Sequence, residues 1–204
     1  WVPHSREARA PDVLRLQGLG LPDLIATIGR KTLRLSPRHS DILAVLVDHP
    51  AGLTSEQLQL EVYAADVHSS TMRAEMTRLR ALLGDAVVQS RPYRLVVDTE
   101  CDWKDVMAHL AAGRVREALQ SYRGPLLPQS ESPGVVSRRE SVQEQLRAAV
   151  LASGKPDLMV AWTRSRWGAD DVVMWQRQQT ALPVSSPLRP VAQAESARLE
   201  RDLA

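Results

Sequence analysis

The sequence predicts an α+β domain followed by an all-helical domain. Residues 13–98 show short alternating segments, then three segments with helical periodicity, then two more short strand-like segments. From residue 99 onward the alternation disappears, and helical segments follow one another between Gly, Pro and Ser breaks. We therefore expect a polar linker at 1–12, an α+β domain at 13–98 and an all-α domain at 99–204.

A small sheet is expected at the start of the α+β domain. Residues 13–17 alternate buried-type Leu14 and Leu16 with polar neighbours, as a half-buried strand does. Two further strands, 24–28 and 32–35, flank a turn at Gly29-Arg30. The three segments together predict a sheet built around a hairpin.

Three helices follow, each with recognisable end signals. Ser36 is a good N-cap, and Pro37 occupies the favoured first helical position. Thr54 and Gln57 have the spacing of a capping box. The third helix is expected to begin with Ser69 or Ser70 as its cap and to end at Gly84.

The third helix has two different faces. At about 3.6 residues per turn, one stripe is apolar and suits a core. Its members are Met72, Met76, Leu79 and Leu83. The opposite face, Arg73, Ala74, Thr77, Arg78 and Ala81, is basic and slim. Such a face suits the DNA major groove, although a solvated surface helix has the same pattern.

Two short strands, 86–89 and 93–97, are predicted around a turn at Ser90-Arg91-Pro92. With this hairpin, residues 36–97 resemble the winged helix-turn-helix of OmpR/PhoB-type response regulators. The segments that carry the resemblance are LSPRHSDILAVLVDHP, LTSEQLQLEVY, STMRAEMTRLRALLG and VVQSRPYRLVV. In that family the third helix enters the major groove and the hairpin wing reaches the minor groove. The wing departs from the family pattern at Arg91-Pro92-Tyr93-Arg94, which is shorter and lacks the family's glycines.

The resemblance implies specific roles for residues of the third helix. Arg78, with Arg73 and Ala74, would face base edges, whereas Thr71, Thr77 and Arg80 would face phosphates. The full expected DNA-binding set is Ser70, Thr71, Arg73, Ala74, Thr77, Arg78, Arg80, Arg91 and Arg94. The implied function is a sequence-specific regulator of transcription that binds double-stranded DNA through helix 70–83. The alternative is a protein–protein interaction module with a degenerate winged helix.

The helical half carries a second resemblance. Helices are expected at 103–112, 114–122, 135–152, 156–167, 169–182 and 187–203. Two short helices, the run YRGPLLP and a long helix resemble the bacterial transcriptional activator domain of actinobacterial antibiotic regulatory proteins, which is built of tetratricopeptide-like helix pairs. Similar halves follow GAF sensor domains in actinobacterial regulators. The implied partners are RNA polymerase, a sensor domain or a second copy; a plain helical domain without a partner surface is the alternative.

Composition narrows the functional classes. The net charge is only +2, but residues 68–94 hold five of the arginines against Glu75 and Asp85. The single cysteine, Cys101, excludes an internal disulfide and indicates a reducing compartment, the cytoplasm. No apolar run is long enough for a membrane span. The chain opens with Trp1 rather than Met, which indicates a C-terminal fragment of a longer protein.

No motif predicts an enzyme, a metal site or a cofactor. The five histidines lack ligand spacing, and Gly18-Leu19-Gly20 lacks the remainder of a dinucleotide-binding motif. Acidic neighbours make Cys101 a poor nucleophile. Asp170-Asp171 is expected at a helix start, where acids favour the dipole. Trp103, Trp162, Trp167 and Trp175 are expected in the core.

Overall fold

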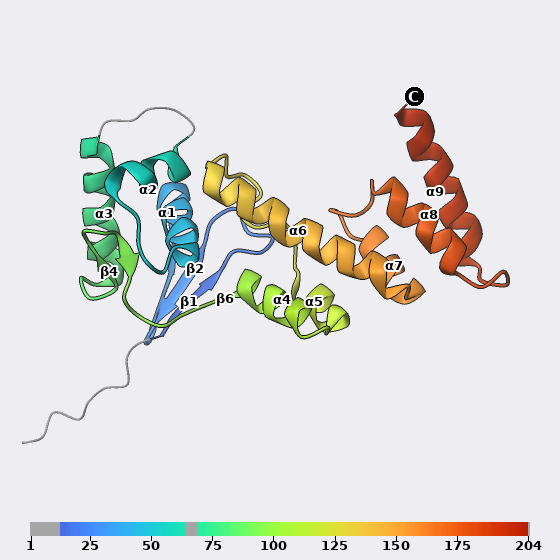
Figure 1. Ribbon diagram of the computed structural model, residues 1–204, viewed down its shortest axis with the longest axis horizontal. Helices are drawn as coiled ribbons and strands as arrows, with labels where there is room; N and C mark the ends of the chain where they lie inside the picture. Colours follow the sequence, from blue (N-terminus) through green and yellow to red (C-terminus); the bar gives the residue numbers. More distant parts are fainter. Residues whose placement is uncertain (1–12, 64–68, 204) are drawn as a thin grey trace, which may run out of the picture. The chain divides into compact units, whose positions relative to one another are not determined.

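A computed structural model describes residues 13–63 and 69–203 of the chain (Figure 1). The expected linker at 1–12 lies outside the described residues. The chain forms two compact units: the first holds the residues up to Cys101 together with 127–138, and the second holds 102–126 and 139–204. An α+β part followed by a helical part was predicted, and this coarse class is confirmed. The expected helical half nevertheless contributes residues 127–138 to the first unit.

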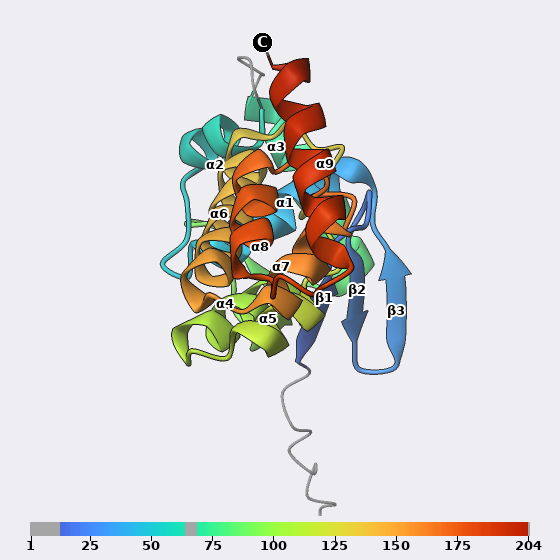
Figure 2. The same ribbon diagram turned by 90° about the vertical axis from the view of Figure 1, so that its right-hand side faces the viewer.

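The first unit contains a four-stranded sheet in the order β3-β2-β1-β6. Its strands are β1 (Leu14–Gln17), β2 (Ile25–Ile28), β3 (Lys31–Arg34) and β6 (Thr99–Cys101). The three predicted strands form antiparallel neighbours, visible side by side in Figure 2. Strand β6 was not predicted, and it pairs in parallel with β1, with Cys101 beside Leu16. Both of these side chains are buried, so the added strand extends the core face.

Helices α1 (Pro37–Asp48), α2 (Ser55–Val62) and α3 (Ser69–Leu83) follow the sheet. Two of the predicted start signals are confirmed. Ser36 Oγ accepts a hydrogen bond from the His39 amide at 3.3 Å, and Thr54 and Gln57 form both bonds of the capping box. Helix α3 already includes Ser69, so the position before its first turn lies outside the described residues.

The end of α3 is fixed from two sides. Gly84 follows it with a φ of +104°, a conformation that favours glycine. Lys31 Nζ on strand β3 donates to the Leu82 carbonyl at 2.7 Å. A cation at the C-terminus of a helix satisfies a free carbonyl and complements the helix dipole.

A short hairpin follows α3, formed by β4 (Val88–Gln89) and β5 (Arg94–Leu95). These strands are shorter than predicted. The hairpin is joined to the start of α2 because Leu53 and Tyr93 exchange two backbone hydrogen bonds, at 2.9 and 2.8 Å. Glycine is required at Gly52, where φ is +88° and a Cβ atom would lie 2.7 Å from Pro92 Cγ.

The segment 127–138 packs within the first unit and contains the start of α6 (Pro133–Ser153). Ser132 Oγ donates to the Val62 carbonyl at 2.8 Å, and Arg138 Nε donates to Asp48 at 2.6 Å. The helix approaches α2 so closely that a Cβ atom on Gly134 would lie 2.6 Å from Glu61 Oε2. These contacts explain why this segment belongs with α1 and α2.

The second unit consists of helices. Besides the later turns of α6 it contains α4 (Asp102–Ala111), α5 (Val115–Ser121), α7 (Pro156–Thr163), α8 (Val172–Ala181) and α9 (Leu188–Asp202). Helices α8 and α9 pack side by side (Figure 2). Trp103, Trp162 and Trp175 are buried as predicted. Trp167 is half-buried, and its ring makes a T-shaped contact with the Tyr122 ring at 5.3 Å between centroids.

Helix α8 starts at a buried carboxylate. Asp171 is its N-cap and accepts a hydrogen bond from the Met174 amide at 3.1 Å, so the predicted placement of Asp170-Asp171 at a helix start is confirmed. Asp171 also accepts two bonds from Arg147, at 2.6 and 2.8 Å, and one from Trp162 Nε1 at 3.1 Å. Burial opposes ionisation of this carboxyl, but the bonds from Arg147 and the Met174 amide outweigh it and lower the pKa of Asp171.

Candidate nucleic-acid interface

Helix α3 presents the two faces predicted from its periodicity. Its apolar stripe is buried, with every member at most 5% exposed. The opposite side carries most of the predicted DNA-binding residues as exposed side chains. These are Ser70, Thr71, Arg73, Ala74, Thr77 and Arg78. The structure therefore gathers two arginines, three hydroxyl residues and a small residue on the outward side of one packed helix.

Arg78 is an exposed arginine of this face, and its guanidinium contacts a carboxylate. Its Nη1 donates to Glu75 Oε1 at 2.7 Å, and its side chain is 65% exposed. The second oxygen of Glu75 lies 3.1 Å from Nε2 of the buried His39 on α1. Neither Glu75 nor His39 was among the predicted site residues. The spacing of Glu75 and Arg78, three positions apart on a helix, was the available signal.

Arg80 has a different environment from the one expected. It is half-buried, and its Nε donates to the Val88 carbonyl at 3.0 Å. Its Nη2 also donates to Ser90 Oγ. Both acceptors belong to the hairpin, so the guanidinium joins α3 to β4 and the turn. The phosphate contact expected of Arg80 would compete with these bonds.

The other predicted residues divide between the helix and the hairpin. Thr77 Oγ1 donates to the Arg73 carbonyl at 2.9 Å, a bond within the helix. Arg94 Nε donates across the hairpin to Gln89 Oε1 at 2.9 Å. Arg91 lies exposed in the turn between the strands. Among the basic residues expected on the hairpin, Arg91 is therefore the one placed on its outside.

A hollow of about 480 Å³ lies beside this face of α3. It is lined by the first residues of α2, by Arg73 of α3, and by Arg91 and its neighbours in the hairpin. The two arginines favour an anion, whereas the amides of Thr54 and Gln57 at the start of α2 already donate within the capping box. Glu56 is the acid in the lining; its own backbone amide and the Thr54 side chain lower its pKa. Arg73 and Arg91 would therefore attract an oxyanion such as a backbone phosphate, and the Glu56 carboxylate opposes them.

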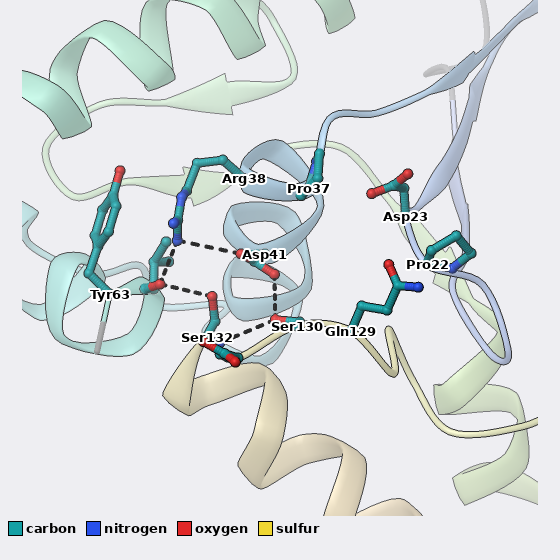
Figure 3. A pocket seen from close by; sticks show the side chains of 11 residues that line it. Pro22, Asp23, Pro37, Arg38, Asp41, Tyr63, Gln129, Ser130 and Ser132 are labelled. Carbon is teal, nitrogen blue, oxygen red and sulfur yellow. Dashed lines mark hydrogen bonds and ion pairs between the residues drawn. The ribbon is translucent and has the colours of Figure 1, made fainter. Parts of the chain in front are cut away.

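A second hollow, of about 460 Å³, lies between the start of α1, the end of α2 and the segment 129–132 (Figure 3). Arg38 lies over the Tyr63 ring, 4.1 Å from its centre, and donates to the Val62 carbonyl at 2.7 Å. Asp41 accepts a bond from Ser130 at 2.6 Å. Burial raises the pKa of Asp41, although the hydroxyls of Ser130 and Ser132 and the charge of Arg38 act in the opposite direction.

This second hollow is acidic and was not foreseen from the sequence. Asp23, Asp41 and Glu131 line it against the single cation Arg38, so its charge disfavours nucleic acid. The segment that closes it carries no motif and lies about ninety residues from α1. Its polar groups are used to attach that segment to the first unit.

Within residues 13–63 and 69–203, no cluster of three or more His, Cys, Asp or Glu side chains has the arrangement of a metal site. Cys101 is buried on strand β6. In the same part of the chain, none of the helices is both long and apolar enough to cross a bilayer.

Two comparisons place the chain among known sequences. Residues 155–204 match the family described as YTH3-like protein, third C-terminal helical domain. The chain is also similar to an uncharacterized 47.3 kDa protein in the thcA 5' region of Rhodococcus erythropolis, with 37% identity over 201 residues and 98% of the chain covered. The chain spans 45% of the length of that protein. The C-terminal helices α7, α8 and α9 thus coincide with a recurring helical domain.

Proposed function

We propose that this chain is a sequence-specific, double-stranded DNA-binding regulator of transcription. The observation that carries the proposal is the outward face of α3, where arginines alternate with small and hydroxyl residues above a fully buried stripe. A helix of this kind can enter the major groove, because slender side chains leave room for arginines to reach base edges. The order α1, α2, α3, hairpin and the resemblance to OmpR/PhoB-type proteins support a winged helix-turn-helix.

The hollow beside α3 supports the same proposal. It brings Arg73 and Arg91 together beside α3, and these two cations would attract a backbone phosphate next to the helix that would enter the major groove. Phosphate contacts fix the register of a protein on the duplex, while base contacts give specificity. In this proposal Arg78 reads a base, Ser70, Thr71 and Thr77 approach the backbone, and Arg91 touches DNA from the hairpin. Arg80 then acts by holding the hairpin against α3.

The helical unit is proposed to adjust DNA binding rather than to perform it. Helices α4 with α5, and α8 with α9, pack as consecutive pairs, which is consistent with tetratricopeptide-like pairing. Such pairs commonly expose surfaces for other proteins, and the candidates are RNA polymerase, a sensor domain or a second copy of the chain. The reducing environment implied by the lone cysteine agrees with a cytoplasmic regulator.

One observation favours the alternative, a winged helix that binds protein. The hairpin strands have two residues each, and Leu60 of α2 and Val96 beyond β5 are exposed, by 69% and 47% respectively. Scattered exposed apolar residues are common on surfaces. These two exposed residues do not explain the basic outward face of α3, whereas the DNA-binding proposal does.

The test is selection of bound fragments from genomic DNA, followed by fluorescence anisotropy at several salt concentrations. A DNA-binding protein must lose affinity steeply as salt rises, because counterions are released from the phosphates. Arg78→Ala should cost about 1–3 kcal/mol on the selected site and far less on random DNA. Arg177→Ala is the matched control, because Arg177 is an exposed arginine on helix α8 of the other unit. Failure to select any sequence, with no salt dependence, would favour the protein-binding alternative.

A further inference from the structure

Three side chains link the core of the first unit to the outward face of α3. His39 of α1 is 5% exposed, the Glu75 side chain is 17% exposed, and the Arg78 side chain is 65% exposed. The contacts are 3.1 Å between His39 Nε2 and Glu75 Oε2, and 2.7 Å between Glu75 Oε1 and Arg78 Nη1. A buried ring, a half-buried carboxylate and an exposed guanidinium therefore follow one another from the inside to the outside.

The buried position of His39 makes this series of three side chains different from an ordinary surface ion pair. An exposed Glu–Arg pair three residues apart contributes little, because both side chains remain free to move. Here one oxygen of Glu75 is held against a ring that cannot move away, since His39 is enclosed in the core. Neither ring nitrogen of His39 makes a hydrogen bond of good geometry among the described residues, and the approach of Glu75 Oε2 to Nε2 is a close contact at 3.1 Å. Two buried ring nitrogens that lack a hydrogen bond favour the approach of the Glu75 carboxylate, because it is the acceptor that the structure places next to Nε2.

The orientation of Arg78 follows from this arrangement. A free arginine loses much rotamer entropy when it docks on a base. The fixed Glu75 oxygen engages Nη1 of Arg78 from the protein side, which restricts the guanidinium before DNA arrives. Recognition of guanine requires two parallel donors aimed at O6 and N7, so restriction of the guanidinium plane favours this base.

From this geometry we infer that Glu75, fixed by His39, is a positioning residue that directs Arg78 toward a guanine in the major groove. The inference rests on the proposed function and deepens it. Glu75 has a second effect, because its negative charge on the DNA-facing helix repels phosphates. The residue therefore strengthens discrimination while it weakens binding to arbitrary sequences. A residue with a purely structural role would not separate these two quantities.

The experiment is a double-mutant cycle on the full chain, using Glu75→Gln, Arg78→Ala and the combination. Affinity is measured for the selected site, for that site with the contacted guanine replaced, and for random DNA. Circular dichroism confirms that each variant is folded. We expect Glu75→Gln to reduce the ratio of specific to random affinity by about tenfold, and to raise the affinity for random DNA because a negative charge is removed. In the Arg78→Ala background the same change should leave the ratio unaltered.

Two variants of His39 separate orientation from charge. His39→Ala should reduce the ratio of specific to random affinity. It should not raise the affinity for random DNA, because Glu75 keeps its charge. His39→Gln should restore part of the ratio, since its amide can donate to Glu75.

Three outcomes would overturn the inference. An unchanged ratio in Glu75→Gln would show that Arg78 needs no positioning. An equal loss in the Arg78→Ala background would show that Glu75 reads a base itself, for example by accepting from cytosine N4. If the parent protein bound all DNA alike, or none, the proposed function would be overturned as well. If the parent bound the selected site specifically but the effects of Glu75→Gln and Arg78→Ala simply added, only the positioning role would be overturned.

Discussion

Replacement of Asp171 by Ala should strongly destabilise the second unit. The carboxylate is 10% exposed and accepts bonds from Arg147, Trp162 and the first turn of α8. Breaking a buried ion pair by removing one partner costs about 3–5 kcal/mol, because the other charge stays buried. Loss of an N-cap adds about 1 kcal/mol, and an unsatisfied indole N–H adds about 1–3 kcal/mol. Arg147 is about a quarter exposed and can be partly rehydrated, so we expect a total of about 3–5 kcal/mol.

Intrinsic fluorescence during urea unfolding is a suitable assay for this change. Four of the five tryptophans, Trp103, Trp162, Trp167 and Trp175, belong to the second unit. The variant Trp1→Leu removes the fifth, so that the signal follows this unit. Asp171→Asn retains the cap and one acceptor and should cost about 1–3 kcal/mol. Asp170→Ala, the exposed neighbour, should change stability by less than about 0.5 kcal/mol. The reasoning would be refuted if Asp171→Ala and Asp170→Ala unfolded at the same urea concentration.

Two further changes test the first unit. Arg80→Ala should lower the stability of this unit by about 1–3 kcal/mol, because the Val88 carbonyl loses its half-buried donor. Limited proteolysis should then cut the hairpin faster. Unchanged proteolysis together with weaker binding to every DNA would instead indicate that Arg80 contacts phosphate. Burial raises the pKa of Asp41, so its contribution is fully present below the unfolded pKa and is lost as pH rises through the folded pKa. The free energy of unfolding of Asp41→Asn minus that of the parent, measured by denaturation monitored by circular dichroism, should therefore increase from about pH 4 toward neutrality. A difference that does not vary with pH would contradict this account.

Local signals in the sequence were sufficient to predict the helix caps and the buried faces of the helices. Ser36 and Thr54 act on amides three residues away, so their partners are visible in the sequence. Strand β6 could not be found in this way. It has three residues, and its partner β1 lies about 85 positions earlier. Ser130 and Ser132 have the composition of a linker, yet they bond to Asp41 and Val62 of the first unit.

The candidate site was predictable where it depends on one helix. Arg73, Thr77 and Arg78 face outward because α3 is regular and its apolar stripe is buried. The positions of Arg80 and Glu75 were not predictable, because each is decided by another element. Arg80 is taken up by the hairpin, and Glu75 meets His39 from α1. Helical periodicity predicts which face of the helix a residue occupies, but it does not predict which residues of other elements contact that face.

The discontinuous first unit has a consequence for biosynthesis. Strand β1 is made at the beginning of this sequence, but β6 and the segment 127–138 emerge much later. At ribosomal speeds of about 5–20 residues per second, roughly 4–17 s separate Gln17 from Cys101. During that interval one edge of β1 has no partner strand, and an unpaired edge invites association with other chains. A nascent chain that stalls before residue 101 therefore exposes this edge, whereas a completed one covers it.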